Sequence, residues 1–249
     1  MMQEFADRIV SNTGVSFDPK KRRLRCMAHI INLATQAFLA AHSKSKHFDP
    51  ADPDTDLTAA VRDGVDCDEV GLVRAIVVKE RSSAKHKELF RCLQMCTDDG
   101  RELQNPGVPL QLLLDMKVRW SSTFLMLRRA LDLKKDVNRF VRHLSLQERD
   151  ADKCRKIMEL ELTEVEWVRM QLLLSLLSYA EKAQHAFSSE QGLALHTALP
   201  ALEALHKAWS TRKSSAKYRD FTSGLNAGLT KVSVYYERTA TSDAHIMAM

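Results

Sequence analysis

Residues 112–133 read LLLDMKVRWSSTFLMLRRALDL, a stretch in which the pattern of apolar side chains changes. Its first residues form an apolar run that is compatible with a buried strand, although the period of so short a run does not distinguish strand from helix. From Ser121 onward the chain has the period of an amphipathic helix, with apolar side chains at Phe124, Leu127, Leu131, Val137 and Val141. The pattern therefore predicts a change from extended chain to helix near Trp120.

Helical patterns extend through most of the remaining chain. Its 249 residues include only 6 Pro and 8 Gly, whereas strong helix formers are plentiful. The spacing predicts helices over residues 2–11, 30–39 and 69–97, and a last helix that contains Phe221 and Tyr236. We therefore expect a mainly α fold.

The best-defined helix start lies at Thr163. Glu166 follows three residues later, as in a capping box, in which each residue hydrogen-bonds the other's backbone N–H group. Leu162 and Trp167 occupy the two positions of a hydrophobic staple. These four residues predict that a helix begins here.

Charge is distributed unevenly along the N-terminal part of the chain. Five of the six residues at 20–25 are basic, namely Lys20, Lys21, Arg22, Arg23 and Arg25. Residues 49–69 instead carry eight acids and one base. Residues 43–66, with Pro50, Pro53 and most of these acids, predict an exposed or disordered loop. The basic run can contact phosphates or act as a nuclear localisation patch, and its alternative role is the solvated start of a helix.

Composition restricts the class of protein. A net charge of +5 and a pI of about 8.9 permit an anionic partner. No apolar run reaches the roughly 20 residues needed to cross a bilayer, and no signal-peptide pattern opens the chain, so we expect a soluble intracellular protein with reduced cysteines. The sequence shows no nucleophile elbow, phosphate loop or metalloprotease motif, so we expect neither an independent enzyme nor a small-molecule substrate.

Cys26 and His29 directly follow the basic run. Their spacing places both side chains on one helix face, which suits two ligands of a tetrahedral metal site, but no second Cys/His pair has a spacing that would complete one. Core packing and support of a DNA-binding surface are the alternatives, and we expect no metal. Cys92 and Cys96, one helical turn apart, are expected to be packed in the core.

Two segments resemble the hAT superfamily of transposases, especially its fungal members. Residues 18–39, DPKKRRLRCMAHIINLATQAFL, are similar to the family's Cys-x-x-His helix, and residues 112–133 are similar to its Arg-Trp-Asn-Ser-Thr-Tyr segment. Ser121 and Phe124 stand where the family has Asn and Tyr. The later stretches LTEVEW, LHTALPALEAL and GLNAGLTKVSVYYERT are similar to the family's helical region, so the resemblance covers nearly the whole chain.

The resemblance implies an RNase H-like α/β core interrupted by a large helical insertion. On this basis we expect four regions. Residues 1–42 would be part of the core with the Cys-x-x-His helix, and residues 43–66 an acidic loop. Residues 67–124 would hold a weak helix and the last core strand with the Arg-Trp motif, and residues 125–249 the helical insertion, truncated at its C-terminal end.

Members of this family cut DNA with Mg or Mn ions held by three acidic residues. The resemblance places two of these acids before this chain and one after it, so we expect an internal piece with no catalytic residue and no cofactor. Asp115 is a lone carboxylate, which we interpret as a strand-end or capping residue. A fragment of an active transposase is the alternative.

The resemblance also implies a set of DNA-binding residues: Lys20, Lys21, Arg22, Arg23, Arg25, Cys26, His29, Arg119 and Trp120. Trp120 is similar to a family tryptophan that lies near the DNA end, where an indole can stack on a flipped base; a core aromatic is the alternative. DNA and related transposase chains are the expected partners, in the nucleus, or in the cytoplasm if DNA binding has been lost. The competing hypothesis is a helical protein-interaction module.

Overall fold

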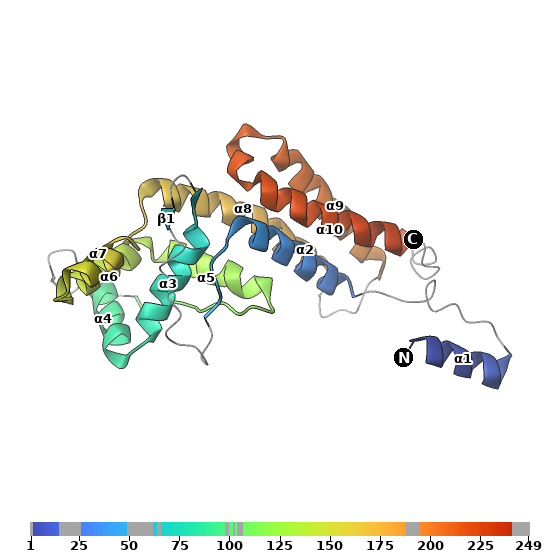
Figure 1. Ribbon diagram of the computed structural model, residues 1–249, viewed down its shortest axis with the longest axis horizontal. Helices are drawn as coiled ribbons and strands as arrows, with labels where there is room; N and C mark the ends of the chain where they lie inside the picture. The colour runs from blue at the N-terminus through green and yellow to red at the C-terminus, as the bar shows by residue number, and fades with distance from the viewer. Residues whose placement is uncertain are drawn as a thin grey trace. The chain divides into compact units, whose positions relative to one another are not determined.

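The computed structural model describes residues 2–14, 26–48, 62–63, 66–97, 100–101, 103, 107–187 and 195–240 (Figure 1). The chain divides into two compact units: unit 1 is Met1–Phe38 with Ser178–Met249, and unit 2 is Leu39–Leu177. Both boundaries lie within helices, α2 (Met27–His42) and α8 (Glu164–Phe187). The two units do not test the four predicted regions, which stay a prediction.

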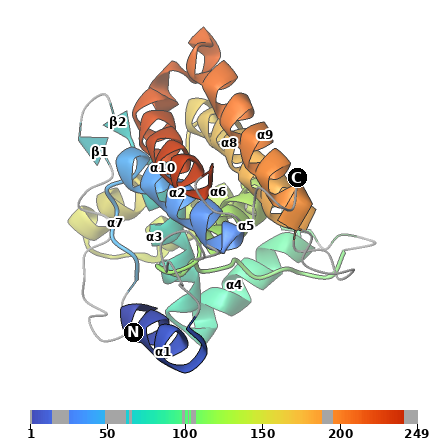
Figure 2. The ribbon, with the colours of Figure 1, turned by 90° about the vertical axis from the view of Figure 1, so that its right-hand side faces the viewer.

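Unit 1 is built from helices. It contains α1 (Met2–Thr13), most of α2, the end of α8, α9 (Leu195–Lys213), the 3-10 helix η1 (Ala216–Phe221) and α10 (Thr222–Ala240). Helices α2, α9 and α10 lie side by side (Figure 2). In their core the ring of Phe38 stacks on that of Trp209 with centroids 5.7 Å apart. A Cβ at Gly228 would lie only 2.5 Å from the Trp209 ring, so the close approach of α10 requires glycine there.

Unit 2 is also mostly helical. It contains α3 (Glu69–Arg81), α4 (Ala84–Met95), α5 (Trp120–Asp132), α6 (Lys134–Gln147), α7 (Ala151–Met158) and the first half of α8. Strands β1 (Arg62–Asp63) and β2 (Asp66–Cys67) pair in an antiparallel hairpin. The rings of Phe90 and Phe140 meet edge to face in the core, 5.5 Å apart, and join α4 to α6.

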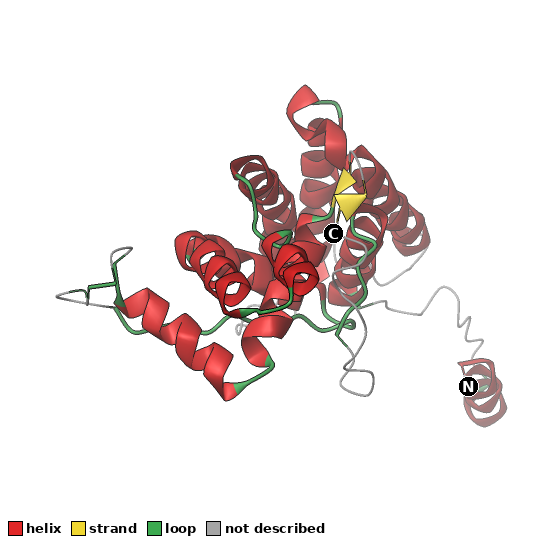
Figure 3. Cartoon of the chain, turned by 60° about the vertical axis from the view of Figure 1, so that its left-hand side comes forward, coloured by secondary structure: helices red, strands yellow, loops and turns green. Residues whose placement is uncertain are grey.

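The prediction of a mainly α fold is confirmed. Among the described residues, β1 and β2 are the only strands (Figure 3). None of the described helices is long and apolar enough to cross a membrane. The helix expected over residues 69–97 is two helices, α3 and α4, because Ser83 begins a new one: its side chain accepts a hydrogen bond from the His86 N–H.

The predicted capping box is present at the start of α8. The Thr163 N–H donates to Glu166 Oε2 at 2.6 Å, and the Glu166 N–H donates to Thr163 Oγ1 at 3.4 Å. Leu162 and Trp167 are both buried, as a hydrophobic staple requires.

The strand expected before Trp120 is wrong. Residues 107–115 form neither helix nor strand. Side chains take the place of a neighbouring strand here: the Gln94 amide bonds both the N–H and the C=O of Leu110, and Arg129 donates to the carbonyl of Gln111. The apolar run of this segment predicted a strand, but the side chains of Gln94 and Arg129 bond backbone groups of Leu110 and Gln111 that a neighbouring strand would otherwise bond.

Candidate nucleic-acid interface

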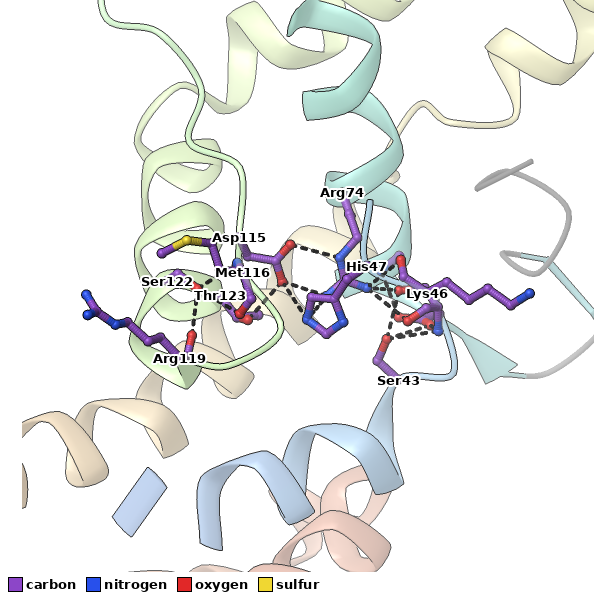
Figure 4. A network of polar contacts seen from close by, with 12 residues as sticks. Ser43, Lys46, His47, Arg74, Asp115, Met116, Arg119, Ser122 and Thr123 are labelled. Carbon is purple, nitrogen blue, oxygen red and sulfur yellow. Dashed lines mark hydrogen bonds and ion pairs between the residues drawn. The ribbon is translucent and has the colours of Figure 1, made fainter. Parts of the chain in front are cut away.

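A buried ion pair lies at the centre of unit 2. The guanidinium of Arg74, on α3, donates from Nε to Asp115 Oδ1 at 2.9 Å and from Nη2 to Asp115 Oδ2 at 2.6 Å (Figure 4). The two residues retain only 3% and 4% of their accessible surface. This bidentate geometry is the strongest form of an arginine–carboxylate contact, and it fixes the orientation of the guanidinium plane relative to the carboxylate plane.

Asp115 is tied to the start of α5 as well. The Thr123 hydroxyl donates to Asp115 Oδ2 at 2.9 Å. One residue earlier on the helix, Ser122 Oγ accepts from the Met116 N–H at 2.8 Å and donates to the carbonyls of Met116 and Arg119. The turn at residues 116–119 is therefore held at both of its ends.

A second loop, residues 43–48, is fastened to α3. The carboxylate of Asp68, the N-cap of α3, accepts from the Gly71 N–H with Oδ1. Its Oδ2 accepts from the Ser43 hydroxyl at 2.8 Å and from the N–H groups of Lys44 and Ser45 at 3.1 Å each. Arg74 Nη1 donates to the carbonyl of Ser45 at 3.1 Å and to its hydroxyl, so Asp68 and Arg74 together fix this loop.

His47 joins the loop to the ion pair. Its Nε2 lies 3.5 Å from Asp115 Oδ2 and 3.5 Å from Arg74 Nη2. Burial and then the positive charge of Arg74 lower the pKa of His47, while Asp115 opposes this shift. Burial acts to raise the pKa of Asp115, but the hydrogen bonds and charge of Arg74, with the Thr123 hydroxyl, hold it below its usual value. The site therefore favours an ionised Asp115 beside a neutral imidazole.

The two fixed turns carry exposed cations. Lys44 and Lys46 are exposed on the loop at 43–48, and Lys117 and Arg119 are exposed on the turn at 116–119. Figure 4 shows the side chains of Lys46 and Arg119 extending away from the ion pair on opposite sides. These exposed cations on the two turns can attract anions.

Trp120, in contrast, is a core residue in this structure. The indole is 2% exposed and lies 6.3 Å from the ring of Phe124. Neither of its faces is open for a base to stack upon, so the core-aromatic alternative describes its position. A stacking role would require the first turn of α5 to move.

The remaining predicted site residues lie elsewhere. Lys20, Lys21, Arg22, Arg23 and Arg25 are outside the described residues. Cys26, just before α2, and His29, on its first turn, are both exposed in unit 1, so the alternative of core packing is wrong for this pair. Cys92 is exposed too, contrary to expectation, because it faces outward on α4 beside Glu88. No group of three His, Cys, Asp or Glu side chains in the described ranges is placed to hold a metal ion.

The comparison with protein families decides the relationship. A family model for the ZBED1 RNase-like helical domain matches residues 24–176, more than half of the chain. The chain belongs to this family. The family is related to the hAT transposases, so the chain is a hAT-like, transposase-related protein. No curated protein and no solved structure matches it.

The matched span contains every residue of the ion-pair network, including several that the sequence patterns did not single out. We had interpreted Asp115 as a strand-end or capping residue, and this was wrong. Its carboxylate is buried and bonds the side chains of Arg74 and Thr123. Arg74 and Asp68 were not predicted at all. One signal was present in the sequence: EVGLVRAIVV, residues 69–78, is apolar on nearly all sides of a helix, which indicates that its single Arg is buried and paired.

Proposed function

We propose that this chain is a transposase-derived protein that contacts DNA without cutting it. One observation carries the proposal: Arg119 is exposed on a turn whose ends are held by Ser122 and by Asp115, in the segment that resembles the Arg-Trp motif of hAT transposases. A guanidinium on a fixed turn loses little freedom when it binds a phosphate, which makes the contact favourable.

The basic run at residues 20–25 supplies the second part of the DNA contact in this proposal. Five cations in six positions can neutralise several phosphates and release their counterions, whatever the base sequence. In line with the family resemblance, the proposal also has the protein act on DNA in the nucleus and pair with related transposase chains. The non-cutting part of the proposal rests on the resemblance, which matches none of the family's three metal-binding acids to a residue of this chain. No cofactor is needed for this activity.

A salt titration of DNA binding tests the proposal. Binding of the purified chain to a labelled duplex is measured by fluorescence anisotropy between about 50 and 200 mM salt, where phosphate contacts weaken steeply. We expect a salt-sensitive affinity that is similar for unrelated sequences. Replacing Lys20, Lys21, Arg22 and Arg23 with Ala should weaken binding on all sequences alike and flatten the salt dependence.

Two variants define the controls. Arg119→Ala should weaken binding and lower the salt slope by about one, whereas Arg155→Ala, at an exposed arginine on α7, should leave both unchanged. A parent chain with no measurable affinity for DNA would overturn the proposal and favour the helical protein-interaction module. Nicking of DNA that depends on Mg or Mn, and that is lost when a carboxylate of this chain is replaced, would overturn the non-cutting part.

A further inference from the structure

The two turns around the Arg74–Asp115 pair both carry exposed basic side chains. Each presents exposed cations, Lys44 and Lys46 on one and Lys117 and Arg119 on the other, although the turns are about 70 residues apart in the sequence. The two turns lie close together, because His47 Nε2, on the first, is 3.5 Å from the carboxylate of Asp115 at the base of the second. The positive charge of Lys117, together with burial and Arg74, lowers the pKa of His47.

The buried pair fixes these turns relative to each other. Arg74 bonds the backbone of Ser45 in one turn and the carboxylate of Asp115 at the base of the other. An ion pair buried this deeply adds little net stability over apolar side chains of the same size, since removing two charges from water costs as much as their attraction returns. What the pair does supply is a defined geometry, with both turns held to one rigid guanidinium plane.

We infer that Lys44, Lys46 and Lys117 extend Arg119 into a surface that binds the phosphate backbone of a nucleic acid. The inference rests on the proposed function and adds three residues to it. Lys46 and Arg119 extend to opposite sides of the ion pair, so these two cations do not converge on one point (Figure 4). Cations spread over two turns match a linear polyanion, whose phosphates recur about every 3.4 Å along each strand, better than they match a single phosphate.

Removing the charges of the three lysines is the direct test. The triple variant Lys44→Ala, Lys46→Ala and Lys117→Ala removes three exposed cations. We expect its affinity for duplex DNA to fall on all sequences alike, by at least tenfold near 50 mM salt, and the slope of log K against log salt to decrease by about 2 to 3. Circular dichroism and thermal unfolding should match the parent, since exposed lysines contribute little to stability.

A matched control removes the same charge from other elements of unit 2. Lys135→Ala, Lys153→Ala and Lys156→Ala lie on α6 and α7, and all three side chains are exposed. This variant should bind DNA with nearly the parent's slope. If the two triple variants lose affinity equally, only net charge matters and the inference is wrong.

The outcomes separate the inference from the function on which it rests. A parent chain that binds DNA, with a first triple variant that binds equally well, contradicts this inference alone and leaves the proposed function standing. A parent chain that does not bind contradicts both. Competition gives an independent readout: inorganic phosphate should displace the DNA no better than chloride at equal ionic strength. Stronger displacement by phosphate would indicate a site for a single anion in place of an extended surface.

Discussion

Arg74 and Glu80, both buried charged residues of helix α3, have sharply different surroundings. Arg74 meets Asp115, whose carboxylate has hydrogen bonds on both oxygens, from the guanidinium and from Thr123. Six residues along the same helix, Glu80 is 0% exposed, and neither of its carboxylate oxygens has a hydrogen-bond partner among the described residues. One carboxylate is kept ionised by its partners, and the other is left to the low-dielectric interior.

The pKa values respond in opposite directions. The pKa of Asp115 lies below its usual value because Arg74 and Thr123 outweigh the effect of burial. Burial raises the pKa of Glu80, and the charges of Arg81 and Lys87 only partly oppose it. The difference shows that burial alone does not decide the charge of a carboxylate: a partner fixed in place by the fold does.

Removing the partnered carboxylate should have the largest effect. Asp115→Ala leaves the Arg74 guanidinium buried without its ion-pair partner, so the free energy of unfolding should fall by about 3–5 kcal/mol. Urea unfolding followed by circular dichroism measures the change. The matched control is Asp152→Ala, which breaks an exposed Asp–Arg pair on α7 and should change stability by less than about 1 kcal/mol. Similar losses in the two variants would mean that the buried pair is no more important than a surface pair.

The unpartnered carboxylate should show the opposite sign. Glu80→Met keeps an unbranched side chain of similar size and removes the buried charge, so it should stabilise the protein by about 1–3 kcal/mol near pH 8. Because the folded chain holds the Glu80 proton to a higher pH than the unfolded chain does, stability of the parent falls as pH rises above about 4.5 and through the raised pKa. Below that range both states are protonated, and the pH-dependent part of the difference should disappear.

The pH profile checks this sign directly. The free energy of unfolding is measured for parent and variant from about pH 4 to pH 8, where an unperturbed glutamate is already ionised over most of the range. Glu159→Met, at an exposed position after α7, serves as the control for the loss of one carboxylate and should not stabilise the protein near pH 8 as Glu80→Met does. A Glu80→Met variant that is less stable than the parent near pH 8 would show that Glu80 has a favourable interaction as an ion.

Much of the fold could be predicted because its signals are local. The capping box at Thr163, the helix near the start of the chain and the mainly α class all depend on residues a few positions apart. The helix end at Gly14 is an example, since its φ of +68° suits glycine and its N–H bonds the Val10 carbonyl. Local patterns of this kind do not depend on how the helices pack.

The candidate site could be predicted only in part, because its contacts are not local. Arg74 and Asp115 are 41 positions apart, and an isolated Asp gives no sign of the guanidinium it will meet. Trp120 was placed correctly at the start of a helix, but its burial depends on the packing of that helix. The missing strand at residues 107–115 has the same cause: an apolar run shows that a segment is buried or extended, and only the fold decides whether another strand lies beside it.

The smallest expected effect concerns the third member of the ion-pair cluster. Thr123→Val keeps the shape of the side chain and removes the hydroxyl that donates to Asp115 Oδ2 at 2.9 Å. Because Arg74 still bonds both carboxylate oxygens, the loss should be about 1 kcal/mol, well below that of Asp115→Ala. Thr230→Val on α10 is the control, since its exposed hydroxyl only bonds the carbonyl of Asn226 on its own helix. If Thr123→Val lowers the free energy of unfolding as much as Asp115→Ala does, the hydroxyl and the guanidinium stabilise the carboxylate only together. If Thr123→Val does not lower it at all, Arg74 alone stabilises the Asp115 carboxylate.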